Sequence, residues 1–262
     1  MLRSFAKLRR AINAELIKTR TTVAFKLAVI YPLIPVLIYG AVMFYYQERI
    51  EAKKIDSWIF FSNVVWNFWS SFALLPLVAL QTIISNNLES SNGGWRNIFS
   101  LSVSRTSIYI AKMLVVALLI FISLCMLSTY VYLYGMIATT FFKSLNFQDY
   151  YPPLLLLYLP CIVMGSSLGI ISIHYFFSVF LKNVYTSFGF GIFVTIIGLF
   201  LIQKQNLAIF FPWGWPALSS TYSNNGEINS VWYIALISSI LTCMVVTTLG
   251  LLSERKLHVV DR

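Results

Sequence analysis

Ionisable side chains are scarce in this chain. Only nine of its 262 residues are Asp or Glu and two are His, and charged residues make up 11% of the whole. A soluble domain usually carries about 25% charged residues. No two of these acids have the spacing of a carboxylate pair or of an HExxH metal site. We therefore expect neither a catalytic centre nor a bound metal in this chain.

Two further kinds of site, a nucleotide-binding loop and a cysteine metal site, are also missing from the sequence. The sequence contains no GxxxxGK[ST] phosphate-binding loop, so we expect no nucleotide or other cofactor bound by this chain itself. Its three cysteines lie within apolar segments and lack the spacing of metal ligands. The formal net charge of +10 is explained by membrane topology and by attraction to anionic lipid headgroups, and we expect no nucleic-acid partner.

What the sequence has in abundance is long apolar runs. Hydrophobic residues make up 58% of it, with a mean hydropathy of +0.77. Crossing the roughly 30 Å of a bilayer core takes about 20 apolar residues in a helix. Six such runs occur, at residues 24–46, 58–84, 108–139, 152–181, 184–202 and 231–252. Because the runs are continuous rather than alternating, they predict an all-α polytopic membrane protein and not a β-barrel.

The predicted organisation is a single membrane domain covering residues 1–262. It comprises an amphipathic helix at 1–23, a six-helix membrane region at 24–252 and a tail at 253–262. Six spans place both termini on one side, and most of the 19 Lys and Arg residues fall on that side. The positive-inside rule therefore predicts that both termini are cytoplasmic.

The first 23 residues lack the apolar core of a cleaved signal peptide. Instead, Phe5, Leu8, Ile12 and Leu16 recur at steps of three and four among basic residues. This periodicity predicts a basic amphipathic helix that lies in the cytoplasmic interface of the membrane. The alternative is a charged tail that only sets the topology.

Few polar residues inside the spans are candidates for function. His174 is the only ionisable side chain deep in a predicted span, which makes it a candidate by default. The alternative is a neutral imidazole hydrogen-bonded to Ser172, Ser178 or a backbone carbonyl. Asn63 and Asn67, with His174, are candidates for a substrate path, although hydrogen bonds between helices would also explain such residues.

Aromatic residues crowd the second span and the segment before the sixth. We expect Trp58, with Tyr45 and Tyr46, in an interfacial aromatic belt. The stretch NLAIFFPWGWPALSSTY at 206–222 is too short and too broken to span a membrane. It predicts a re-entrant element on the outer side, with a loop lying in the interface as the alternative. The residues of this element are Phe211, Pro212, Trp213, Gly214, Trp215 and Pro216.

The loop at 85–107 carries the most specific pattern. A turn at 91–94 precedes Trp95, Ile98 and Phe99, which would share one face of a short helix, with Arg96 beside them. So short a helix cannot bury its apolar face alone. We expect it to lie on the membrane or to dock into a groove on a partner.

The segment that begins at Glu89 and reads E…GGWRNIFSLSVSR…IYIAK resembles the permease subunits of ABC-2 transporters. In that family, a comparable stretch between spans two and three forms the coupling helix that docks on the ATPase. Glu89, Gly94, Trp95, Arg105 and Lys112 match the pattern. The family often has a proline where this chain has Ser102. Within that family, the chain resembles the small permeases of lantibiotic and bacitracin immunity.

The resemblance implies a permease subunit in the bacterial cytoplasmic membrane that exports a hydrophobic or amphipathic substrate, a peptide antibiotic or a lipid-like molecule. It implies two cytoplasmic ABC ATPase subunits, which would bind ATP and Mg, and a second permease subunit. The implied ATPase-coupling residues are Glu89, Gly94, Trp95, Arg96, Ile98, Phe99 and Arg105. The alternative is a membrane-anchored interaction or assembly protein that recruits a soluble partner without transporting anything.

Overall fold

The computed structural model describes residues 2–47, 56–90, 105–141, 145–149, 152–181, 184–221 and 231–260. Throughout these ranges the regular structure is helical, without a strand. Six helical segments are long and apolar enough to cross a membrane: Val23–Tyr45, Ser57–Asn86, Thr106–Phe141, Leu155–Phe180, Tyr185–Ile202 and Trp232–Ser253. The prediction of an all-α chain with six helices of spanning length is therefore confirmed.

Most of these segments consist of one helix, and two are interrupted. The first comprises α2 (Val23–Ile30) and α3 (Leu33–Tyr45); the second comprises α5 (Ser57–Phe68), the π-helical turn η1 (Trp69–Ala73) and α6 (Leu74–Ser90). The other four are α8 (Arg105–Phe141), α9 (Leu155–Phe180), α10 (Val184–Ile202) and α13 (Trp232–Val260). The shorter elements are α1 (Leu2–Arg20), η3 (Phe147–Asp149), α11 (Gln205–Ala208), η4 (Pro212–Gly214) and α12 (Trp215–Ser220).

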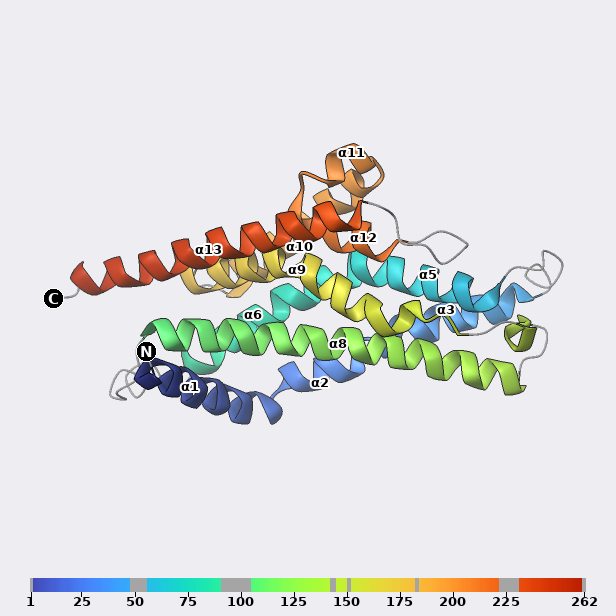
Figure 1. Cartoon of the computed structure of the whole chain (residues 1–262), viewed down its shortest axis with the longest axis horizontal. Coiled ribbons are helices and arrows are strands. Elements are labelled where there is room, and N and C mark those ends of the chain that lie inside the picture. Colours follow the sequence, from blue (N-terminus) through green and yellow to red (C-terminus); the bar gives the residue numbers. More distant parts are fainter. Residues whose placement is uncertain are drawn as a thin grey trace.

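The helices form an elongated bundle, shown along its length in Figure 1. Both chain ends lie at the left of that view, and we call this the terminal end; α3, the start of α5 and η3 lie at the opposite end (Figure 1). Helix α8 runs through almost the whole length, and α9 packs against both α8 and α13. Helix α10 packs against α6. Both chain ends share one end of the bundle, as an even number of spans requires.

Prolines lie at the two interruptions of the first and second spans. The break between α2 and α3 falls at Tyr31–Pro32, and η1 immediately precedes the turn that contains Pro76. Proline lacks the N–H that would bond four residues back, so the preceding turn often widens or kinks. Pro160 lies within α9 and leaves the carbonyl of Leu156 without its helical donor. The hydroxyl of Ser128 in α8 donates to that carbonyl at 2.7 Å, and thereby satisfies it.

The core at the opposite end is aromatic. Trp58 is 1% exposed, packs its ring edge-on against Phe147, and donates from Nε1 to the Phe147 carbonyl at 3.1 Å. The prediction of Trp58 in a lipid-facing belt was therefore wrong, because η3 and α8 cover it and its indole N–H bonds within the protein. Tyr45, at 80% exposure, does face outward as a belt residue would.

Helix α1 lies beside the first part of α8 (Figure 1). Among its side chains from residue 7 onward, the buried ones are Ala11, Glu15 and Thr19, one turn apart on a single face. The apolar residues Leu8 and Ile12, which the periodicity indicated, are half-buried at the edges of this contact. Part of the amphipathic face is thus used against protein. That the helix also lies in a membrane interface stays a prediction.

Candidate functional site

The residues of the predicted coupling helix lie mostly outside the part of the chain that the structure describes. Gly94, Trp95, Arg96, Ile98 and Phe99 all fall in the undescribed range 91–104. Two more predicted coupling residues are placed by their backbones alone. Glu89 belongs to the last turn of α6, and Arg105 is the first residue of α8. The role assigned to these seven residues stays a prediction.

Two of the predicted substrate-path residues line one pocket. The pocket has a volume of about 340 Å³ and is lined by Tyr39, Asn63, Val64, Asn67, Phe68 and Ser71. Its polar residues on the second span follow a four-residue spacing, at positions 63, 67 and 71, which places their side chains on one helix face. That spacing could have predicted Ser71 as the third member. Nothing in the sequence indicated that Tyr39 of α3 would complete the lining.

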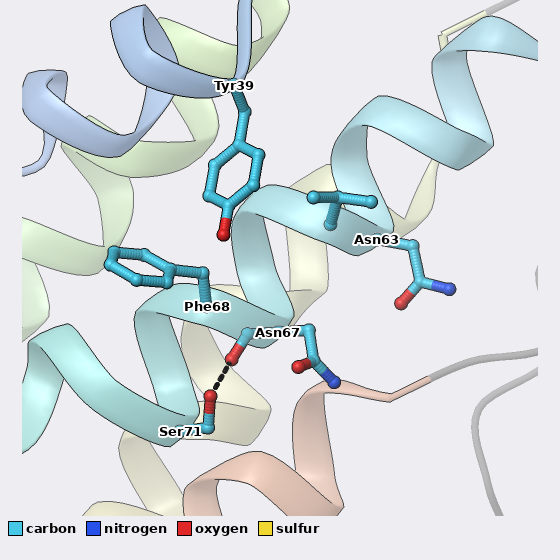
Figure 2. Close-up of a pocket in the computed structure, with 6 residues that line it drawn as sticks. Tyr39, Asn63, Asn67, Phe68 and Ser71 are labelled. Carbon is cyan, nitrogen blue, oxygen red and sulfur yellow. Dashed lines mark hydrogen bonds between the residues drawn. The ribbon is translucent and has the colours of Figure 1, made fainter. Parts of the chain in front are cut away.

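The pocket has a polar and an aromatic side. Figure 2 shows the amides of Asn63 and Asn67 pointing to one side of α5 and Phe68 to the other, while Tyr39 reaches across from α3. The rings of Tyr39 and Phe68 meet edge to face, with centroids 5.5 Å apart. The hydroxyl of Ser71 donates back to the Asn67 carbonyl, as Figure 2 shows. The arrangement can offer amide hydrogen bonds and apolar contact to the same ligand.

The pocket adjoins the widened turn of the second span. Ser71 belongs to the π-helical turn η1, and its neighbour Ser70 donates to the Trp66 carbonyl at 2.6 Å. The Ser70 hydroxyl also pairs with the hydroxyl of Ser220 at the end of α12. π-Helical turns of this kind occur frequently at functional sites. The turn therefore connects the pocket-bearing helix to the segment that precedes the sixth span.

The second half of that segment, the predicted re-entrant element, is buried from residue 213 to residue 220, whereas Phe210 is exposed. The chain turns through α11 and η4 into α12, which packs against α9, α13 and η1. Residues Trp213, Gly214, Trp215 and Pro216 are all buried, and Trp215 donates from Nε1 to the Ile209 carbonyl at 2.7 Å. The broken backbone is thus enclosed by helices, as a non-helical segment at membrane depth would need. Its position relative to a bilayer stays a prediction.

His174 bonds to this element. Its Nε2 accepts a hydrogen bond of 3.0 Å from Nε1 of Trp213, and the two rings meet edge to face with centroids 5.8 Å apart. An indole N–H can only donate, so Nε2 carries no proton while this bond is made. The observed partner of Nε2 is thus Trp213, which neither alternative named, and the hydroxyls of Ser172 and Ser178 donate to backbone carbonyls of their own helix.

A glycine lets the fifth span approach this histidine closely. A Cβ atom at Gly191 of α10 would lie 2.7 Å from the Cβ of Ala79 and 3.3 Å from Cε1 of His174. Helices α6, α9 and α10 therefore meet at the His174–Trp213 bond. His174 is not among the residues that line the Asn63–Asn67 pocket. The three predicted substrate-path residues belong to two separate places.

A charged cluster lies at the terminal end, and sequence reasoning missed it. Lys112 of α8 is 1% exposed and donates from Nζ to the Ser85 carbonyl of α6 at 2.9 Å. The same Nζ lies 3.7 Å from Oε2 of Glu15 in α1. The available signal was that Glu15 is the only acid in α1 and that Lys112 enters an apolar run. Within the described ranges, no group of three or more His, Cys, Asp or Glu side chains is placed to hold a metal ion.

The fold defines a class: a multi-pass helical membrane protein with six helices of spanning length, a buried broken segment before the last, and a polar pocket on the second. Over residues 11–198 the sequence matches the family described as ABC-2 family transporter protein, and the chain belongs to that family. No curated protein and no solved structure matches the chain.

Membership of this family establishes the general function of the chain. The chain is a membrane component of an ABC transporter, of a kind that is generally non-catalytic and associates with ABC ATPase partners. The finer resemblance to lantibiotic and bacitracin immunity permeases stays a prediction, as do the substrate and the direction of transport.

Proposed function

We propose that this chain is the permease subunit of an exporter, in which a separate ATPase drives a hydrophobic or amphipathic substrate across the bacterial cytoplasmic membrane. The observation that carries the proposal is the pocket of Asn63, Asn67 and Phe68 in a chain of the ABC-2 transporter family. Polar groups on a membrane-spanning helix are unfavourable in lipid unless they are hydrogen-bonded or used for function.

The pocket's lining favours a substrate with both polar and apolar parts. Amides at Asn63 and Asn67 can donate and accept hydrogen bonds, so they suit a headgroup or a peptide backbone. Phe68 and Val64 offer apolar contact within the same lining. A volume of about 340 Å³ is at the small end for ligand sites, and fits a headgroup or one or two side chains of a larger substrate.

In this proposal the ATP chemistry belongs to partner chains. Two ABC ATPase subunits bind ATP and Mg, and each docks on a coupling helix around Trp95–Phe99 of one permease. A second permease subunit completes the transporter, and both termini face the cytoplasm. Family membership supports the ATPase partners. The copy numbers are what the resemblance implies, and the orientation is predicted from the Lys and Arg distribution.

The experiment is reconstitution of the chain, with the ABC ATPase that copurifies with it, into proteoliposomes. The probes are a fluorescent phospholipid and a cationic amphipathic peptide, tested separately for transport and for stimulation of ATP hydrolysis. Asn67→Leu should reduce stimulation by about two- to tenfold, the effect of losing one hydrogen bond worth roughly 0.5–1.5 kcal/mol. Thr129→Val, an exposed polar residue of α8 outside the pocket, is the matched control.

The result also separates the two readings of the chain. Hydrolysis that responds to a probe and weakens in Asn67→Leu alone supports transport through this pocket. An ATPase that binds the chain but responds to neither probe, in the wild type or the variants, would favour a membrane anchor that recruits a partner without transport.

A further inference from the structure

The cluster at the terminal end is built from buried charge. Glu15 is 7% exposed and Lys112 is 1% exposed, so neither side chain is hydrated as a surface ion would be. A buried ammonium is stable only when its donors are satisfied and an opposite charge lies nearby. Nζ of Lys112 donates to the Ser85 carbonyl at 2.9 Å and lies 3.7 Å from a Glu15 carboxylate oxygen, so the ammonium has both a hydrogen-bond acceptor and an opposite charge within reach.

Three separate helices supply the three groups. Glu15 comes from α1, Ser85 from α6 and Lys112 from α8. The other carboxylate oxygen of Glu15 lies 3.1 Å from Nζ of Lys18, whose side chain is 44% exposed. Lys18 therefore faces water, and Lys112 is the partner that joins α1 to the bundle. We call Glu15, Ser85 and Lys112 the charged node.

The node sits beside the segment that connects the second and third spans. Ser85 lies five residues before the end of α6 at Ser90, and Lys112 lies seven residues after the start of α8 at Arg105. These two helices lead into and out of residues 91–104. A single ammonium group thus bonds one helix of this connection to the other, and holds α1 against both.

We propose that Lys112 is a positioning residue, through which α1 and the cytoplasmic ends of α6 and α8 move together when the ATPase acts on the segment between them. This inference rests on the proposed function. A force applied at residues 91–104 reaches both spans because the bond from Lys112 to Ser85 prevents α6 and α8 from separating. The force also reaches α1, because the ion pair makes Glu15 move together with Lys112.

Three variants separate the two interactions of the charged node, the Glu15–Lys112 ion pair and the Lys112–Ser85 hydrogen bond. Glu15→Gln removes the charge that holds α1 and keeps the bond between α8 and α6. Lys112→Met removes both. The exchanged pair Glu15→Lys with Lys112→Glu restores an ion pair between α1 and α8, but a carboxylate cannot donate to the Ser85 carbonyl. Lys7→Met, an exposed lysine on the same helix, is the control.

Two measurements are made on each variant in the reconstituted complex: amide hydrogen exchange in α1, and substrate transported per ATP hydrolysed. Lys112→Met and Glu15→Gln should each speed exchange in α1 by about tenfold or more through local release of the helix. Lys112→Met should lower transport per ATP by about fivefold or more, within the usual range of coupling between sites. The exchanged pair should recover α1 protection without recovering transport per ATP, and Lys7→Met should match the wild type.

Each outcome decides a separate point. Unchanged exchange in Glu15→Gln and Lys112→Met would overturn the node as the attachment of α1. Normal transport per ATP in Lys112→Met, in a complex whose wild type transports, would overturn its coupling role alone. A wild-type complex that transports neither probe overturns the proposed function and the coupling role with it. Should Lys112→Met fail to fold, Glu15→Gln and the exchanged pair carry the same comparison.

Discussion

The terminal end of the bundle and the buried segment before the sixth span are held by different chemistry. At the terminal end, Lys112 and Glu15 form a buried ion pair whose ammonium also bonds a backbone carbonyl. Next to α12, which lies near mid-length in Figure 1, the broken segment is joined to α9 by the neutral bond from Trp213 to His174. The first attachment gains strength from low polarity around it, and the second depends on shape and on one donor.

This difference predicts how each region fails. Removing one member of a buried ion pair strands a charge that water cannot reach. Removing one member of a neutral hydrogen bond strands only a dipole. The terminal end should therefore be the more sensitive to single substitutions, and the mid-length segment should tolerate replacements that keep an acceptor.

The largest expected effect is that of Lys112→Met. The variant loses the bond to Ser85 and leaves Glu15 with Lys18 as its ion-pair partner, so it should cost about 3 kcal/mol of folding stability, the lower end of the range for a broken buried ion pair. Thermal unfolding of the purified chain in detergent, followed by circular dichroism, measures the loss. Lys112→Arg keeps the charge and should cost less. If Lys112→Met lost less folding stability than His174→Leu, the buried ion pair would not be the more sensitive of the two attachments.

The intermediate effect is that of His174→Leu. The substitution leaves the indole N–H of Trp213 buried without an acceptor, at a cost of about 1–3 kcal/mol. His174→Gln provides an amide oxygen and should retain most of the stability. The same unfolding measurement tests both, and the fluorescence of Trp213, with the other tryptophans replaced by phenylalanine, reports the local change. Equal losses for Leu and Gln would show that packing and not the hydrogen bond holds the segment.

The smallest expected effect is that of Ser128→Ala. The change removes the donor to the Leu156 carbonyl that Pro160 leaves free, and should cost about 0.6 kcal/mol, and up to roughly 2. The double variant Ser128→Ala with Pro160→Ala restores a helical donor and should recover the loss. Failure of the second change to compensate would indicate that Ser128 contributes through packing instead.

The number and type of the long helices could be predicted from hydrophobicity, but the contacts between the helices could not. Six runs of apolar residues specify six helices because a bilayer leaves the backbone no other partner. The helices extend past the predicted spans, as α8 does from Arg105, since hydropathy marks the membrane and not the end of a helix. Asn63 and Asn67 could be grouped from their spacing alone, because one helix carries both.

The pairs that hold the bundle together were beyond prediction. His174 and Trp213 are 39 residues apart, and which span meets which broken segment depends on how the helices pack. Lys112 was noted in the sequence as a match to the family pattern, and its burial could not be predicted because it depends on α1 covering it. Trp58 was misplaced for a similar reason. An aromatic residue near the end of a span is equally compatible with a lipid-facing and a buried position, and here it is buried because η3 packs against it.

The charged node also sets an order of events during synthesis. Glu15 leaves the ribosome long before Lys112, and in the folded protein its carboxylate also pairs with Lys18, three residues further along α1. Helix α1 can therefore rest in water or on the membrane while the first two spans insert. Only the arrival of the third span brings the ammonium that draws Glu15 out of water. The ion pair at the terminal end is therefore completed by the third span, which carries Lys112, and not by the first.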